Sequence, residues 1–135
     1  MPHLVVFYSP ELEAATDMRA LCRSLSATLL GQRDDAGKPL FPTAGTRVLA
    51  FAATHSVVAD GKHDCAFVYL NLRMAKGRSG SAQQRAGDDL IATVRAHFAP
   101  IFGQKRLGVT LQIDEGHEVY DAKHSNLPPL FGVPA

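Results

Sequence analysis

The chain begins with a chemically suggestive pair, Met1 followed by Pro2. Initiator methionine is usually removed before a small residue, and removal would turn the Pro2 nitrogen from an amide into a secondary amine. A free α-amine titrates near pH ~8, and both desolvation at a strand end and nearby arginines lower that pKa because they disfavour the charged form. Such an amine is partly neutral near pH ~7 and can accept a proton. Pro2 is therefore a candidate general base.

Two arginines are candidate partners for this base. Arg78 stands in Gly77-Arg78-Ser79, where we expect a strand to end and a helix to begin. An arginine there can bind a carboxylate through two parallel hydrogen bonds, while the helix end adds backbone N–H donors. Arg47, at the start of another expected strand, is a similar case. Taken singly, Arg78 fits a solvated turn residue and Arg47 fits a structural salt bridge, so neither decides the function alone.

The histidines and cysteines form no recognisable catalytic or metal motif. The six histidines are scattered at positions 3, 55, 63, 97, 117 and 124. His63 beside Asp64 could contribute to a metal site, but no second pair supports it, and His97 beside an apolar helix stripe fits a structural role. Cys22 and Cys65 lie in apolar surroundings, which indicates buried free thiols in a reducing compartment, with a disulfide or a nucleophile as the alternative.

The elements that position these residues form two similar units. In the first, a buried strand is predicted from His3 to Tyr8 and another from about Thr46 to Ala53. Apolar residues at helical spacing lie between them and end near Gly31. This helix begins after Ser9 or after Asp17, since both residue types can cap a helix.

The second unit repeats the same order. A strand with alternating faces is predicted from Asp64 to Met74, and a further strand from Leu107 to Asp114. Between them the spacing predicts a helix that runs to about Phe102. Its cap is Ser79 or Ser81, and Ser81 with the glutamine three residues later fits a capping box.

The chain thus contains two strand–helix–strand units, at about residues 2–53 and 64–114, followed by a Pro-rich tail. This order predicts an α/β fold of the α+β two-layer sandwich type. Crossovers of this length favour parallel pairing within each unit. The two units can form one four-stranded sheet with both helices on one face, as a single domain over residues 1–135. The other sheet face would stay partly apolar, so we expect a homo-oligomer.

Composition narrows the class of function. The formal net charge is +1, which indicates no general attraction to nucleic acid or to a membrane surface. The start of the chain lacks the pattern of a signal peptide and no apolar run is long enough to span a bilayer, so we expect a cytoplasmic protein. The sequence contains no G-x-S-x-G, P-loop or H-E-x-x-H motif.

In this setting, a set of short pieces resembles the 5-carboxymethyl-2-hydroxymuconate isomerase family of the tautomerase superfamily. They occur in order over nearly the whole chain. The matching pieces are Met1-Pro2-His3, Phe41-Pro42, Ala44-Gly45-Thr46-Arg47, Ala59-Asp60-Gly61-Lys62-His63-Asp64, Ala66-Phe67-Val68, Gly77-Arg78-Ser79, Gln84-Arg85-Ala86-Gly87 and His97-Phe98.

The resemblance implies a fold, an assembly and a reaction. It implies duplicated β-α-β units, a homotrimer, and conversion of 5-carboxymethyl-2-hydroxymuconate, an unsaturated dicarboxylate, to its 2-oxo-3-ene isomer in bacterial homoprotocatechuate catabolism. By resemblance, Pro2 is the catalytic base, Arg78 is a catalytic and substrate-binding residue, and Arg47 is a substrate-binding residue. No metal or organic cofactor is implied.

Two rival functions remain open at this stage. The first is a tautomerase that acts on another enol or unsaturated acid. The second is a non-enzymatic trimeric small-molecule binder in which Pro2 has no chemical role. A retained Met1 should lie at the mouth of a pocket that contains Arg78, and if Pro2 is not the base, His3 or His63 would be the next candidates.

Overall fold

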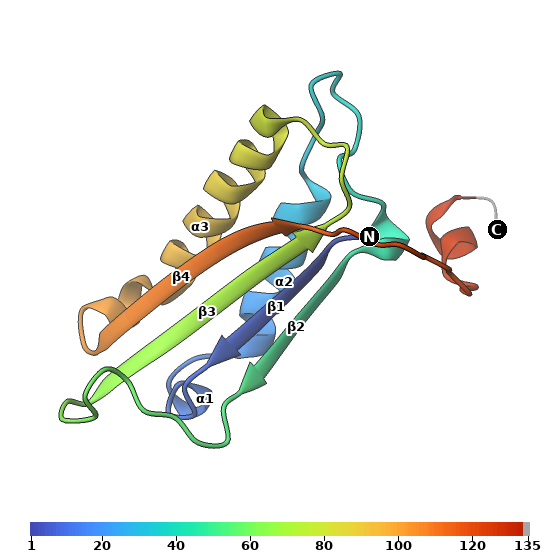
Figure 1. Ribbon diagram of the computed structural model, residues 1–135. Helices are drawn as coiled ribbons and strands as arrows, with labels where there is room; N and C mark the ends of the chain where they lie inside the picture. Colours follow the sequence, from blue (N-terminus) through green and yellow to red (C-terminus); the bar gives the residue numbers. More distant parts are fainter. Residues whose placement is uncertain (134–135) are drawn as a thin grey trace.

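A four-stranded sheet with two long helices on one face forms the body of the protein, shown by a computed structural model that describes residues 1–133 (Figure 1). The strands are β1 (His3–Tyr8), β2 (Arg47–Ala52), β3 (Cys65–Met74) and β4 (Arg106–Glu115). Their order across the sheet is β2-β1-β3-β4. Pairing is parallel within β1–β2 and β3–β4 and antiparallel between β1 and β3. The predicted α+β two-layer sandwich is therefore confirmed.

The helices are α1 (Leu12–Ala15), α2 (Met18–Leu30) and α3 (Gly80–Phe102), with the 3₁₀ turns η1 (Thr43–Gly45) and η2 (Pro128–Phe131). Of the two predicted starts for the first long helix, the one after Asp17 is right, because the Asp17 carboxylate accepts a hydrogen bond from the Ala20 N–H. Ser9 is instead buried and bonded to the Phe67 backbone.

The predicted capping box at the start of α3 is wrong. Ser79 is the cap, because its hydroxyl accepts a hydrogen bond from the Ala82 N–H at 3.1 Å. Ser81 points its hydroxyl at Asp35, 46 residues earlier in the chain, at 3.0 Å. Gln84 bonds to Asp88 further along the same helix. A tertiary contact has therefore taken Ser81 away from the local role that its spacing suggested.

The core lies between the sheet and the helices. Alternate residues of β3 are buried against α2 and α3, as the two-residue period of a strand requires. From the helix side, Leu21, Leu25, Leu90 and Phe98 are fully buried at helical spacing. Each such side chain contributes about 1.5–3 kcal/mol relative to an exposed one, so this layer holds the two units together.

The other sheet face is open. Phe7 is 46% exposed and Phe51 is 48% exposed, and their rings stack at 5.8 Å between centroids. On the β3–β4 half of the same face, the Tyr69 hydroxyl donates to Gln112 at 2.8 Å. This open face is thus mainly apolar over β1 and β2 and mainly polar over β3 and β4.

One end of the sheet gathers the residues singled out above. Because the two parallel pairs run in opposite directions, β1 and β2 begin where β3 and β4 end. Figure 1 shows the N-terminus at this end, with the chain after β4 passing close by. We call it the site end. Within residues 1–133, no helix has the length and apolar character needed to cross a membrane.

Candidate active site

Pro2 is buried at the site end, one residue before β1. Its carbonyl accepts a hydrogen bond from the Arg47 backbone N–H at 3.1 Å, so a bond at the start of the parallel β1–β2 pair fixes its position. His3, the next residue, is exposed on the open face. Strand alternation therefore directs Pro2 toward the helix side and His3 toward the opposite side.

The chain start lies in an environment that favours a neutral amine. The pKa of the Met1 amino group is lowered from its ordinary value of 8.0, first by burial and then by the positive charges of Arg78 and Lys123. Asp121 and Glu118 act in the opposite direction but are weaker causes. Removal of Met1 would place the new amine one residue further inward, where Pro2 is buried.

Met1 itself rests on Gly45. A Cβ atom at Gly45 would lie only 2.8 Å from the Met1 Cγ, so this buried position accepts the methionine because it has no side chain. Met1 is 38% exposed. The methionine therefore covers η1 and lies close enough to Arg78 for that cation to affect its amino group.

Arg78 is half-buried in the connection from β3 to α3. Its Nε donates to the Leu40 carbonyl and its Nη1 donates to the Ala75 carbonyl, both at 3.2 Å. The guanidinium carbon lies 4.8 Å from the centroid of the Phe41 ring. Burial lowers the pKa of Arg78, but an arginine stays charged at neutral pH. Within residues 1–133, Nη2 has no hydrogen-bond partner, so this atom can meet an anion.

A cavity of about 540 Å³ lies beside Arg78. Its walls come from two segments, 34–40 and 76–79, and include Asp34, Asp35 and Lys76. Met1 is not among the lining residues, so the expectation that Met1 stands at the mouth of the Arg78 pocket is not met. A second cavity, about 460 Å³ between α3 and β4, is lined by none of the candidate catalytic or substrate-binding residues.

Arg47 approaches the site end from the other face. It is the register partner of His3, and it shares the open face with that residue. Its Nη1 donates to the carbonyls of Ala44 at 2.6 Å and Thr46 at 3.3 Å. The structure thus brings the backbone of Arg47 to Pro2 and the charge of Arg78 to the chain start, but it leaves the two guanidinium groups on different sides.

Three charged residues of the tail were missed at the sequence level. Glu118, Asp121 and Lys123 follow β4 and influence the amino group of the chain start. Lys123 also forms an ion pair with Asp121. Leu40 and Phe41, which hold Arg78, were missed as well, although Phe41-Pro42 belongs to the pieces that carry the family resemblance. Only the fold brings these residues near the site.

The remaining candidates have structural surroundings. His97 forms a 2.9 Å hydrogen bond with the Thr16 hydroxyl, and burial lowers its pKa. Cys22 and Cys65 are free and only partly buried. His63 is exposed, and no group of three or more metal-binding side chains comes together within residues 1–133.

Comparisons with known proteins agree over nearly the whole chain. The model of the 5-carboxymethyl-2-hydroxymuconate isomerase family matches residues 2–131. The chain belongs to this family. A 5-carboxymethyl-2-hydroxymuconate Delta-isomerase of Escherichia coli is 31% identical over 131 residues, which cover 97% of this chain and 99% of that protein.

Solved structures of the 5-carboxymethyl-2-hydroxymuconate isomerase family superpose closely. A crystal structure of a 5-carboxymethyl-2-hydroxymuconate delta-isomerase has 50% identity and a TM-score of 0.92, covering 97% of this chain and 93% of that one. A 5-carboxymethyl-2-hydroxymuconate isomerase from Deinococcus radiodurans R1 has 30% identity and a TM-score of 0.85, covering 96% and 93%. More distant likenesses to solved structures, at 10–20% identity, show the fold alone. The chain is accordingly an isomerase of this family.

Proposed function

We propose that this isomerase acts on 5-carboxymethyl-2-hydroxymuconate, or on a closely related unsaturated dicarboxylate, with the amine of Pro2 as general base. The observation that carries the proposal is the environment of the chain start, where burial and the charge of Arg78 both favour a neutral amine. An amine accepts a proton only in its neutral form, so this environment suits the role.

The reaction moves one proton and two double bonds. The Pro2 nitrogen takes the proton of the 2-hydroxyl group, so the O–H bond breaks and a C2=O bond forms. The C2=C3 double bond shifts to C3=C4, and the electrons of the C4=C5 bond form a new C5–H bond with a proton returned by the amine. Substrate and product are isomers, and the dienol is already activated, so the scheme uses no metal or organic cofactor.

The two arginines have separate roles in this scheme. Arg78 stabilises the negative charge that develops on the 2-oxygen and binds the neighbouring carboxylate, with Nη2 as the donor that its contacts leave available. Arg47 binds a distal carboxylate through the guanidinium N–H groups that are not bonded to the carbonyls of Ala44 and Thr46. The substrate would then be held by one cation from each side of the sheet end.

Exposed aromatic residues support an assembly for this protein, and its free cysteines support a location. A homotrimer would cover the apolar half of the open face, where Phe7 and Phe51 are about half exposed. The two β-α-β units and the tail act together as one domain over residues 1–135. Two free thiols fit a cytoplasmic protein, since that compartment keeps thiols reduced.

Intact mass and a ketonisation assay test the proposal together. Protein purified from its native host should lack Met1 and should ketonise 2-hydroxymuconate-type dienols, whereas a variant with one extra residue before Pro2 should not. Faster turnover of phenylpyruvate than of the dienols would favour a tautomerase of another enol. Absence of turnover on all of them would contradict the proposed substrate class. Enzymatic rates from protein that retains Met1 would rule out the proline base.

Labelling of Pro2 gives an independent measure. A haloacid that alkylates the amine should abolish all activity at one equivalent per chain, because the second unit begins inside the chain and has no free amine. Residual activity after complete labelling would contradict this and would require a second site.

A further inference from the structure

The segment from Asp34 to Phe41, which we call the 34–41 loop, makes two contacts with Arg78. The Leu40 carbonyl accepts from its Nε, and the Phe41 ring lies under its guanidinium. Phe41 is nearly fully buried and Leu40 is buried as well, so neither contact partner is free to move. The direction of the Arg78 guanidinium is therefore set by where this loop sits.

The loop is closed on itself. The Asp34 N–H donates to the Lys38 carbonyl at 2.8 Å, and the Asp34 carboxylate accepts from the N–H groups of Ala36 and Lys38, each at 2.9 Å. The Leu40 N–H then donates to the Gln32 carbonyl at 2.9 Å. Because of these bonds, contacts that hold the tip of the loop also hold the segment that returns from it, and hence Leu40.

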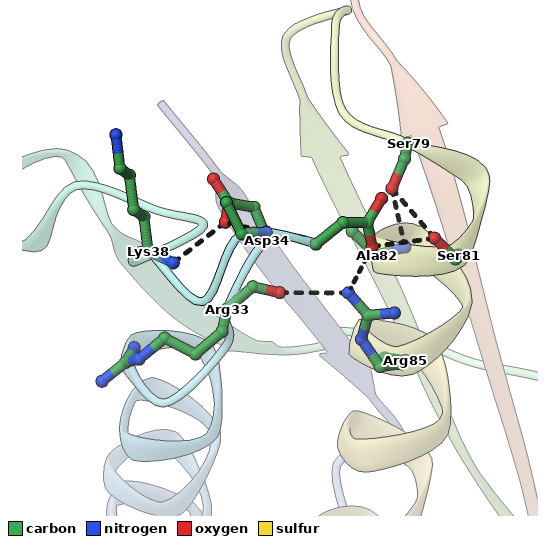
Figure 2. A network of polar contacts seen from close by, with 9 residues as sticks. Arg33, Asp34, Lys38, Ser79, Ser81, Ala82 and Arg85 are labelled. Atoms are coloured by element: carbon green, nitrogen blue, oxygen red, sulfur yellow. Dashed lines mark hydrogen bonds and ion pairs between the residues drawn. The ribbon is translucent and has the colours of Figure 1, made fainter.

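The tip is tied to the first turns of α3, as Figure 2 shows. The Asp35 carboxylate accepts from the Arg85 guanidinium at 2.9 Å and from the Ser81 hydroxyl at 3.0 Å. Arg85 also donates to the Arg33 carbonyl at 3.3 Å. Hydrogen bonds from Ser79, Arg85 and Ser81 lower the pKa of Asp35 to about 2, so the carboxylate stays ionised at neutral pH. We call Asp35, Ser81 and Arg85 the loop clamp.

We infer that the loop clamp and Phe41 are positioning residues, which hold the Arg78 guanidinium toward the N-terminal amine and the substrate carboxylate. None of them needs to touch the substrate. An arginine side chain has many rotamers, and fixing one of them before the substrate arrives removes part of the cost of binding and of charge stabilisation. The inference rests on the proposed function, because it assigns a purpose to the direction of Arg78.

Asp35→Asn is the first test variant. It keeps the size of the side chain but removes the charge that Arg85 pairs with. We expect kcat/KM for a dienol dicarboxylate to fall ~10-fold, less than for loss of Arg78 itself, because small misplacements of a binding group cost one to two orders of magnitude. Arg85→Lys should retain more activity than Arg85→Gln, since a lysine can still pair with Asp35. Asp88→Asn, an exposed carboxylate on the same helix, is the matched control and should leave kcat/KM unchanged.

The pH profile separates positioning from a merely structural role. The amine is flanked by Arg78, by Lys123, Asp121 and Glu118 of the tail, and by the start of β2 with Arg47. If Arg78 loses its fixed direction, the acid limb of kcat/KM should move to higher pH. Removal of the Asp35 negative charge would by itself lower the pKa of the amine or leave it unchanged. An upward shift of the acid limb can therefore come only through Arg78.

The outcomes are distinguishable. An unchanged acid limb and unchanged kcat/KM in Asp35→Asn, in a protein whose Arg78→Ala variant is impaired, would overturn the inference. A wild-type protein without an acid limb, or insensitive to labelling of Pro2, would instead overturn the proposed function. If Asp35→Asn fails to fold by circular dichroism, Ser81→Ala, which removes one hydrogen bond of the clamp, and Phe41→Leu apply the same criterion.

Discussion

At the scale of the residue, Arg78 is the side chain whose surroundings are most informative. Two of its N–H groups are bonded to carbonyls and its face lies on an aromatic ring, so the free edge of the guanidinium has one direction. Such an arrangement is typical of an arginine that recognises an anion, because the donors needed for recognition remain available while the side chain is held.

We therefore expect Arg78→Ala to lower turnover of a dienol dicarboxylate ~100-fold or more, since loss of one charge-stabilising donor typically costs that much. The fold should be retained, because Arg78 is only half-buried and lies outside the hydrophobic core. Steady-state kinetics and the thermal midpoint measure the two effects. Arg95→Ala, an exposed arginine in α3, is the control. Wild-type turnover in Arg78→Ala would show that Arg78 is a surface residue.

At the scale of the element, N-cap residues determine where the helices begin. Asp17 caps α2 with a bond to the Ala20 N–H at 3.0 Å. Asp17→Ala should lower the free energy of unfolding by about 1 kcal/mol, because one N–H of the first turn loses its partner. Urea unfolding of this variant measures the change, with Asp64→Ala as the control at an exposed position before β3. An equal midpoint in both variants would mean that the cap contributes nothing.

The Asp35 carboxylate of the loop clamp makes the stability of the fold decrease at low pH. Asp35 has a folded pKa of about 2 against an ordinary value of 3.8, so its contribution is present above pH 3.8 and is lost as pH falls toward about 2. We expect the thermal midpoint of Asp35→Asn to converge on that of the wild type between these two values. Thermal melts at a series of pH values test this. A difference that stays constant down to pH 2 would contradict the assignment.

The elements were largely predictable from the sequence, because strand alternation and helical spacing are local. The strands β1 to β4 begin and end within one residue of their predicted bounds, and α3 ends at Phe102 as predicted. The errors come from long-range contacts. Ser81 bonds to Asp35 rather than to its own helix, and nothing near Phe41 in the sequence indicates that its ring meets Arg78. Pro2 and Arg78 stood out by residue type, while their surroundings required the fold.

At the scale of the whole molecule, the open face has two characters. The β1–β2 half carries stacked aromatic rings, and the β3–β4 half carries hydrogen-bonded polar pairs such as Asn71 with Asp114 at 2.7 Å. A monomer would leave the apolar half in water, which is unfavourable and rare for a patch of this kind. The protein is expected to bury it against copies of itself.

Light scattering at micromolar concentration should accordingly give the mass of a trimer. Phe51→Glu should shift the protein toward the monomer, because it places a charge in the apolar half of the open face. Phe102→Glu is a matched control, since Phe102 is similarly exposed at 52% but lies at the end of α3 on the helix side. A monomeric wild type, or equal dissociation in both variants, would contradict the proposed assembly.

The opposed directions of the two units have a consequence for handling the protein. Cys65 pairs with Arg106 at the start of the second unit as His3 pairs with Arg47 at the start of the first, but at the opposite end of the sheet. Cys65 lies eight residues along β3 from Arg73, the partner of His3, which places that end roughly 26 Å from the start of β1. The turn from Val58 to Gly61 lies there, next to the exposed Val57. An affinity tag or a surface tether inserted in this turn would leave the start of the chain unblocked, whereas the proposed proline base predicts that a fusion before Pro2 abolishes activity.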